Sequence, residues 1–412
     1  MSDALQREPR DVRMIGFADR SSVNEAVEWI DRYSRICDAE SIALNAAIGR
    51  ILAEPFVSPT EDPPTDTAIT DGYALRSCET VGAGSYNPLP FSMQDYHSAL
   101  RPFSAALVTS GTPLPMGADA VAPFDLAQAG TDIVHLIGSV ARGEGVNAKG
   151  QEIRKDTLLI EGLRPLRASD LGLISSFGIN QVRVLRRPLV RIILAGRKSS
   201  QGYKLADANG LMLRAHVVRD GGAVEICKYG ITDRDKLAKW IARPGADLVL
   251  VCGRTGVGLD DEAPLALAAV GTLDLHGIAM RPGGSTGMGS AGQIPVILLP
   301  GSPLDCLCAY DLFAGRLIRN LSGRGPWLPY RVQQAKVGRK IVSSVGTMEF
   351  CQVRLIAGEA IPQGTADSGG LSSVARADGF ISIPATLEGY APGATVNVYT
   401  YDSTHEVEGI WK

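Results

Sequence analysis

A glycine-rich loop at residues 253–261, GRTGVGLDD, combines two residue types that phosphate chemistry uses. Its chemistry-bearing residues are Gly253, Gly256, Gly258, Asp260 and Asp261. Glycines let the backbone approach a ligand closely with its amides free for phosphate oxygens, and a carboxylate can hold Mg²⁺ beside them. The same residues also suit an ordinary helix start, where acidic side chains interact with the helix dipole. Both interpretations stay open on these residues alone.

A second candidate loop follows at residues 300–303, which read PGSP. Its residues are Pro300, Gly301, Ser302 and Pro303. Ser302 suits the N-cap position of a helix and Pro303 the first helical position, so a capped helix explains the segment without a ligand. The free amides at such a helix start also attract anions.

A third stretch, DTAITDGYALR at residues 66–76, places two aspartates, Asp66 and Asp71, in a loop after a Pro-Pro pair. Asp tolerates the left-handed region and the following glycine supplies positive φ, so the local pattern predicts a β-turn. Nothing within the stretch itself requires a catalytic role.

The elements that position the first two loops are short apolar runs at residues 189–195, 248–252 and 296–299. Continuous apolar runs are typical of strands covered on both faces. Helical patterns alternate with them at residues 209–220, 233–243, 261–270 and 303–320. This alternation predicts a doubly wound parallel α/β domain over about 186–324. Ligands bind at the carboxyl ends of strands in such sheets, which is where these loops fall.

The rest of the chain predicts smaller units. Ser22 and Glu25 form a capping-box pattern ahead of apolar residues at helical spacing, which predicts an amphipathic helix over 22–33. Residues 54–147 are rich in Pro and Gly and contain short strand-like runs, which indicates an irregular β-rich lobe. Residues 167–178 predict a short helix that ends on a glycine. Alternation near the C-terminus predicts a small β-domain.

Composition narrows the class of protein. The chain has 412 residues and a formal net charge of -3, which favours several domains and gives no basic footprint for nucleic acid or an anionic membrane. The first 20 residues lack an apolar leader and are expected to form a frayed tail. Scattered cysteines without paired spacing indicate reduced thiols and a cytoplasmic location. Cys306 and Cys308 are expected in a core rather than at a metal.

Five stretches, taken together and in order, resemble one family, the molybdopterin molybdenumtransferases (bacterial MoeA proteins and the gephyrin E-domain). They lie at 66–76, 110–125 (SGTPLPMGADAVAPFD), 253–261, 281–285 (RPGGS) and 299–303 (LPGSP). The resemblance runs from about residue 20 to 405. It implies a homodimer in which each chain has a linking domain, an inserted lobe, an α/β molybdopterin-binding domain and a C-terminal β-barrel. The implied boundaries are 20–58 plus 146–185, 59–145, 186–324 and 325–412.

The resemblance also implies a reaction, the hydrolysis of adenylylated molybdopterin with insertion of molybdate and release of AMP, which requires Mg²⁺. A molybdopterin adenylyltransferase and a client molybdoenzyme are the implied partners. Asp71, Asp233 and Asp261 match the catalytic carboxylates, Asp71 reaching the site across the dimer, and Asp261 and Asp71 are the implied metal ligands. The implied cofactor-binding residues are Ser110, Gly253, Gly256, Gly258, Arg281, Pro300, Gly301, Ser302 and Pro303.

The chain departs from the family pattern at several site positions. Arg197 and Lys198 stand where the family has an acidic pair, Arg254 lies in the glycine-rich loop, and Gly284 replaces a lysine. A lysine beside the expected metal raises the cost of holding Mg²⁺ and favours an anion. Two hypotheses follow: an active enzyme of molybdenum cofactor assembly, or a degenerate paralogue that binds molybdopterin as a carrier or scaffold.

Overall fold

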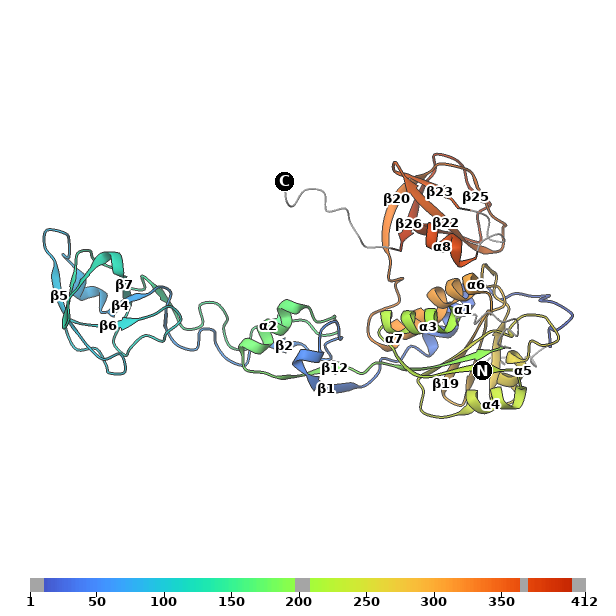
Figure 1. Ribbon diagram of the computed structural model, residues 1–412, viewed down its shortest axis with the longest axis horizontal. Coiled ribbons are helices and arrows are strands. Elements are labelled where there is room, and N and C mark those ends of the chain that lie inside the picture. The colour runs from blue at the N-terminus through green and yellow to red at the C-terminus, as the bar shows by residue number, and fades with distance from the viewer. Residues whose placement is uncertain (1–10, 197–207, 364–369, 402–412) are drawn as a thin grey trace, which may run out of the picture.

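The structure is a computed structural model that describes residues 11–196, 208–363 and 370–401, except the side chains of 226–229. The chain forms an elongated molecule (Figure 1). A β-rich lobe lies at one end and a small linking domain in the middle. An α/β domain lies at the other end with the C-terminal domain beside it.

The α/β domain is built on a six-stranded sheet in the order β14-β13-β15-β19-β18-β16. Its strands are β13 (Leu189–Ala195), β14 (Ala223–Ile231), β15 (Leu248–Cys252), β16 (Thr272–His276), β18 (Gly287–Ala291) and β19 (Ile294–Leu299). The first four in the sheet order run parallel, and three of them, β13, β15 and β19, occupy the predicted apolar runs. The sequence prediction missed β14 at one edge of the sheet and also β16 and β18, which pair antiparallel, so the sheet is mixed.

Helices cover both faces of this sheet, as expected for a doubly wound fold. They are α3 (Ala208–Arg219), α4 (Arg234–Ala242), α5 (Ala263–Ala268), α6 (Pro303–Ala309) and α7 (Gly315–Leu321). A π-helical turn, η4 (Tyr310–Ala314), joins α6 to α7. One core cluster includes α3, α6 and α7, and a second includes α4 and α5, so each face has its own core. Each fully buried Leu, Ile or Val contributes about 1.5–3 kcal/mol by removing its side chain from water.

Helix α1 (Val23–Arg32) has the predicted capping box, in which Ser22 and Glu25 each accept a backbone N–H of the other residue. It lies on the α/β domain, although the sequence interpretation grouped it with the linking segments. Its buried residues Ala26, Trp29 and Ile30 join the core of α3, α6 and α7. The indole of Trp29 also donates to Asp274 Oδ2 at 2.7 Å. Burial of a large aromatic side chain explains this docking.

The linking domain pairs segments from both sides of the inserted lobe. β1 (Ala39–Ala43) pairs with β12 (Gln181–Leu185), and β2 (Phe56–Val57) pairs with β11 (Leu158–Ile160). Helix α2 (Ala168–Ser176) and the short η1 (Leu44–Ala46) contribute to the core over these strands. The domain is therefore discontinuous in sequence. A short pair, β3 (Thr67–Ala68) with β10 (Val146–Asn147), leads into the lobe.

The inserted lobe holds a six-stranded sheet in the order β7-β4-β6-β5-β9-β8. Its strands are β4 (Gly72–Leu75), β5 (Leu89–Met93), β6 (Ser104–Val108), β7 (Ala120–Pro123), β8 (Ala127–Ala129) and β9 (Ile133–Leu136). Short 3₁₀ turns, η2 (Ser77–Thr80) and η3 (Phe124–Leu126), join them. The lobe has its own core, which includes Leu75 and Phe91.

The C-terminal domain closes into a five-stranded barrel because β22 pairs with both β23 and β24. Its strands are β20 (Arg331–Val337), β22 (Met348–Ile356), β23 (Glu359–Pro362), β24 (Gly379–Ile383) and β26 (Thr395–Thr400). The remaining elements are β21 (Ile341–Val342), β25 (Gly389–Tyr390) and α8 (Leu371–Arg376). A strand from the α/β domain, β17 (Met280–Arg281), adds to β22. The multidomain α/β architecture thus agrees with the predicted fold class.

The helices and the cysteines of the molecule bear on the expectations about a membrane and about reduced thiols. In the described ranges, no helix is both long and apolar enough to cross a bilayer. The six cysteines whose side chains are described are free, and both Cys306 and Cys308 are buried, as predicted. Cys306 Sγ lies 3.6 Å from Cys252 Sγ, inside the core of the α/β domain.

Candidate functional site

The end of β13 and the loops that follow β15 and β19 meet at the carboxyl edge of the sheet. Gly253 has φ +95°, and a Cβ atom there would lie 2.4 Å from Ala195 O, so only glycine fits. A Cβ atom on Gly301 would lie 3.3 Å from Gly253 Cα. The backbone of two loops, without side chains at Gly253 and Gly301, therefore lines this edge of the sheet. The replacements at Arg197 and Lys198 fall outside the described residues.

Asp261 organises the glycine-rich loop. Its Oδ2 atom accepts the backbone N–H of Gly258 at 2.7 Å. A Cβ atom on Gly256 would lie 2.8 Å from the same oxygen, so the loop wraps closely around this carboxylate. The neighbouring Asp260 side chain is 83% exposed. The two carboxylates thus differ: Asp261 shapes the loop and Asp260 faces solvent.

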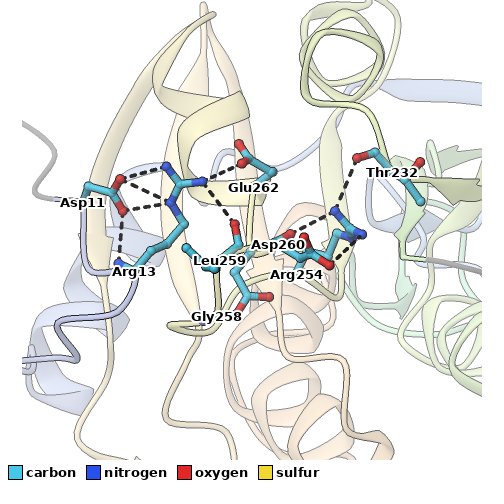
Figure 2. A network of polar contacts seen from close by, with 9 residues as sticks. Asp11, Arg13, Thr232, Arg254, Gly258, Leu259, Asp260 and Glu262 are labelled. Atoms are coloured by element: carbon cyan, nitrogen blue, oxygen red, sulfur yellow. Dashed lines mark hydrogen bonds and ion pairs between the residues drawn. The ribbon is translucent and has the colours of Figure 1, made fainter.

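Arg254 fixes the other side of the same loop (Figure 2). It is a non-glycine residue at φ 57°, a conformation that costs about 1 kcal/mol or more. Its Nη1 atom donates to Asp260 O at 2.9 Å and to Thr232 O at 3.3 Å. Its guanidinium lies 3.9 Å from the Asp260 carboxylate. The departure from the family pattern at this position therefore places a cation inside the loop.

The N-terminal segment covers this loop, although the sequence analysis predicts a frayed tail there. We call residues 11–17 the strap. Arg13 donates to Glu262 Oε1 at 2.5 Å and to Leu259 O at 3.3 Å (Figure 2), and Met14 N donates to Val257 O at 2.8 Å. The prediction was wrong for these residues because their binding partners lie more than two hundred positions away in sequence. Strap, loop, α5 and β16 enclose a small pocket that Gly256 and Asp261 line.

His276 lines the same pocket and contacts the loop through its side chain. Its Nε2 atom is 2.9 Å from Thr255 O, which can only accept, so this nitrogen carries the proton. Phe17 of the strap meets the imidazole edge-on at 5.0 Å. Burial lowers the pKa of His276 below its usual value of 6.5, although the Thr255 contact and Asp261 oppose this effect. The ring therefore acts as a neutral hydrogen-bond donor near pH 7.

Segment 281–285 brings cations to the edge of this site. Arg281 is exposed at the end of β17, and its guanidinium lies 3.7 Å from Glu349 Oε1 of the barrel. Arg20 donates to Gly284 O at 2.9 Å, in space that a Cβ atom on Gly284 would occupy. Burial lowers the pKa of Arg20, and the nearby charge of Arg281 adds to this effect. Two guanidinium groups therefore stand along this segment, one of them missed by the sequence analysis.

The helix start after β19 differs from the sequence prediction in one respect. Ser302 is the N-cap residue and Pro303 the first helical residue of α6, as predicted, but the Ser302 side chain makes no capping bond. Asp305 accepts Gly283 N at 2.8 Å and so ties segment 281–285 to α6. Asn209 donates to Gly301 O at 2.9 Å. Pro300 precedes this turn, and Ser302 remains exposed with its hydroxyl free of a capping role.

Asp233 sits beside these loops in a structural role. It is the N-cap residue of α4, where its Oδ1 accepts Lys236 N at 2.8 Å. The preceding Thr232 O accepts from Arg254, which connects the start of α4 to the glycine-rich loop. The side chain of Asp233 is exposed. Its predicted catalytic role remains a prediction.

Asp71 and Ser110 lie together, but in the lobe. Asp71 Oδ1 accepts Ser110 N at 2.7 Å, and the Ser110 hydroxyl donates to Ile69 O at 2.8 Å. Both residues are exposed. The lobe and the α/β domain occupy opposite ends of the chain (Figure 1). Within one chain, Asp71 is therefore not brought to Asp261.

The carboxylates of the glycine-rich loop decide how this site could hold Mg²⁺. No group of three or more His, Cys, Asp or Glu side chains suited to a metal occurs in the part of the chain that the structure describes. Mg²⁺ is usually held by only one or two carboxylates together with substrate phosphates and waters. Asp260 and Asp261 meet that smaller requirement at the edge of the glycine cradle. The residues fit a cation that arrives with a phosphate ligand rather than a preformed metal cage.

The residues that sequence reasoning missed are Arg13, Arg20, Asn209, Thr255 and His276. Arg13 and Arg20 belong to a segment without local pattern, and their partners are distant in sequence. His276 carried a weak signal, because a histidine interrupts an otherwise apolar run. No signal within a single sequence identifies Thr255, which is buried and lies 3.1 Å from Ser285 Oγ.

Three family models match the chain in order and leave only short gaps. Residues 21–178 match the MoeA N-terminal region (domains I and II), residues 191–320 a probable molybdopterin-binding domain, and residues 334–401 the MoeA C-terminal region (domain IV). Together they span all four parts of the molecule. The match begins after the strap.

Full-length relatives agree with these models. The chain is 27% identical over 408 residues to molybdopterin molybdenumtransferase 2 of Mycobacterium tuberculosis, covering 92% of this chain and 99% of that protein. It is 27% identical to the molybdopterin molybdenumtransferase of Bacillus subtilis, covering 94% and 96%. A crystal structure of a molybdopterin biosynthesis MoeA protein from Pyrococcus horikoshii superposes with a TM-score of 0.79 at 28% identity, covering 94% and 100%. The chain belongs to the MoeA family of molybdenum cofactor biosynthesis proteins.

Proposed function

We propose that this protein inserts molybdate into adenylylated molybdopterin and releases AMP. One observation carries the proposal: the backbones of the loops at Gly253 and Gly301 come close together, and Asp261 lies in the first of these loops. A pyrophosphate needs backbone amides and a divalent cation, and this edge offers the amides and a carboxylate. The relatives named as molybdopterin molybdenumtransferases support the same reaction.

The residues of the chain would divide the work as follows. Gly256, Gly258 and Gly301 supply the surface on which the nucleotide phosphates lie. Arg281 and Ser302 supply a cationic and a hydroxyl donor for the tetrahedral oxyanion, molybdate. Charged donors held in fixed positions stabilise charge that develops during the reaction without further reorganisation.

Mg²⁺ enters the proposal as a phosphate-bound cation. When bound, it neutralises charge on the phosphate oxygens and favours departure of AMP. Asp261, with Asp71 from a second subunit, would hold it. Asp261 keeps one carboxylate oxygen free of the Gly258 contact, which leaves a position for a cation or its water.

The assignment of Asp71 and Ser110 requires a second copy of the chain. Both lie in the lobe, and the elongated shape gives this lobe reach beyond its own α/β domain (Figure 1). We propose a two-fold homodimer in which the lobe loop of one subunit faces the partner's glycine-rich loop. Sedimentation at micromolar concentration should then report a dimer, and a monomer would count against the shared site.

Reconstitution with purified components tests the reaction. The protein is incubated with adenylylated molybdopterin, molybdate and Mg²⁺, and both AMP release and activation of an apo-molybdoenzyme are measured. The proposal predicts both products, with Mg²⁺ required. Tight pterin binding without AMP at any Mg²⁺ concentration would instead establish the carrier or scaffold role. Molybdopterin adenylyltransferase and a client molybdoenzyme are the proposed partners on either side of this step.

A further inference from the structure

A second pocket lies where the linking domain meets the α/β domain, away from the loops described above. We call it the junction pocket. Its lining residues are Gly49, Arg50, Ile51, Leu185, Arg186, Arg187, Gly221, Ser322 and Arg324. Arg50 comes from the linking domain, whereas Gly221, Ser322 and Arg324 come from the α/β domain and the segment just after α7. No acidic side chain is among these lining residues.

Two of the four arginines have acidic partners just outside the pocket. Arg50 donates to Glu40 Oε1 at 2.6 Å and to Leu185 O at 2.8 Å. Arg186 makes a two-pronged contact with the Asp247 carboxylate at 2.6 and 2.9 Å. These contacts hold both guanidinium groups in fixed orientations beside the pocket.

The other two arginines have no acidic partner in the described ranges. Arg324 donates only to a backbone oxygen, Gly49 O, at 2.9 Å. Arg187 makes no side-chain hydrogen bond or ion pair there, and its side chain is exposed. Four guanidinium groups less the two paired carboxylates leave a local charge of about +2. A concave surface with this charge attracts anions.

Two further carboxylates act on these arginines, Asp38 on Arg186 and Asp220 on Arg324. Asp220 already pairs with Arg219 at 3.0 Å and with Arg319 at 3.2 Å. Burial is the main cause that lowers the pKa of Arg324, and the charges of Arg187 and Arg50 lower it further, against the opposing effect of Asp220. The like charges of Arg187 and Arg50 thus act on Arg324, and no acidic side chain lines the pocket itself.

The backbone at Gly221 makes room for this arrangement. Gly221 has φ +93°, and a Cβ atom there would lie 2.6 Å from Arg324 Nε and 2.8 Å from Ser322 Oγ. Glycine at this position therefore leaves the space that the Arg324 side chain occupies beside the backbone of the pocket. The built geometry and the uncompensated charge point to the same class of ligand.

We propose that the junction pocket binds a multiply charged tetrahedral oxyanion of the phosphate type, with Arg187 and Arg324 as its main contacts. Guanidinium groups match such anions because their planar N–H donors form paired, charge-assisted hydrogen bonds. Arg50 and Arg324 come from different domains, so a bound anion would tie the linking domain to the α/β domain. The site is independent of the proposed molybdenum insertion, since none of its residues lines the candidate functional site.

Calorimetric titration of the full chain in a low-salt buffer without phosphate tests the proposal. Inorganic phosphate, AMP and molybdate are titrated separately, which distinguishes a free anion, a nucleotide phosphate and the reaction's own oxyanion as occupants. The Arg187→Ala/Arg324→Ala double variant is compared with Arg142→Ala, which removes an arginine that is 87% exposed in the lobe. Circular dichroism verifies that each variant folds.

At least one of the three anions should bind saturably, and the double variant should weaken its binding by about tenfold to a hundredfold, as expected for lost charged hydrogen bonds. Arg142→Ala should leave binding unchanged. Binding that is equal in the double variant and the control, or the absence of saturable binding by all three anions, would overturn the proposal. An Arg324→Lys variant should lose part of the affinity, because lysine keeps the charge but not the paired donors.

Discussion

Two loops of this molecule each contain an aspartate whose side chain accepts one backbone N–H. Asp71 in the lobe and Asp261 in the α/β domain each accept a backbone N–H at 2.7 Å, from Ser110 and Gly258 respectively. The Asp261 contact closes a turn between residues three positions apart, whereas the Asp71 contact joins two loops 39 positions apart, and each is sufficient to explain its aspartate structurally. The local geometry therefore does not distinguish a turn former from a catalytic group.

The surroundings distinguish the two loops. Asp261 lines a pocket together with the strap, α5 and the half-buried His276, all within one chain. Asp71 precedes β4 in the lobe, at the other end of the molecule (Figure 1), where its side chain accepts from Ser110 of a second exposed loop. A carboxylate gains chemistry from what other elements bring to it, so the proposed catalytic role of the lobe loop would require a second subunit.

The largest effect is expected at Asp261. The Asp261→Asn variant keeps an oxygen that can accept Gly258 N but loses the charge, so the fold should persist while AMP release falls about a hundredfold or more. Asp261→Ala should lose the loop contact as well. Turnover by both variants is compared with their free energies of unfolding. Equal, small losses of turnover in both variants would mean that Asp261 is only a turn former.

A smaller effect on the free energy of unfolding is expected when the pH is lowered, because His276 becomes protonated. Its pKa is lowered in the folded protein, so the unfolded chain binds more protons as the pH falls. Stability is then full above the usual pKa of 6.5 and decreases as the pH falls below it. Denaturant unfolding at pH 7.5 and 5.0 measures this loss, which the His276→Gln variant should reduce. His216, whose pKa burial also lowers, contributes with the same sign and should leave a residual slope.

The smallest effect is expected at the strap. Arg13→Ala removes the contacts to Glu262 and Leu259 O, and because the pair is partly exposed, the free energy of unfolding should fall only slightly. Hydrogen exchange should nevertheless accelerate at the Met14 amide, which donates to Val257 O. Unchanged exchange there would show that the strap is held by contacts other than those of Arg13.

The sequence predicted the elements whose signals are local. β13 and β15 occupy the expected apolar runs, and α1 begins at the predicted capping box because Ser22 and Glu25 act on each other. The turn at Gly253 and the helix start at Ser302 were also placed at the edge of the sheet. These features depend on residue types a few positions apart.

The features that could not be predicted from the sequence depend on residues that are far apart in the chain. Arg13 meets Glu262 249 positions along the chain, and Trp29 reaches Asp274 245 positions away. β16 and β18 lack the continuous apolar runs of the parallel strands, because they form the antiparallel edge of the sheet. The positive φ of Arg254 has no signal in its own type, since the conformation normally favours glycine.

Subunit complementation tests the shared site most directly. The Asp71→Asn and Asp261→Asn variants are either coexpressed, or purified separately, unfolded, mixed and refolded together. In both procedures the subunits pair at random. If each site joins Asp71 of one subunit to Asp261 of the other, a mixed dimer holds one intact site. The mixture should then recover about a quarter of the unmodified activity, because about half of the dimers are mixed. A mixture as inactive as each variant alone, with mixed dimers present, would contradict a site shared between subunits.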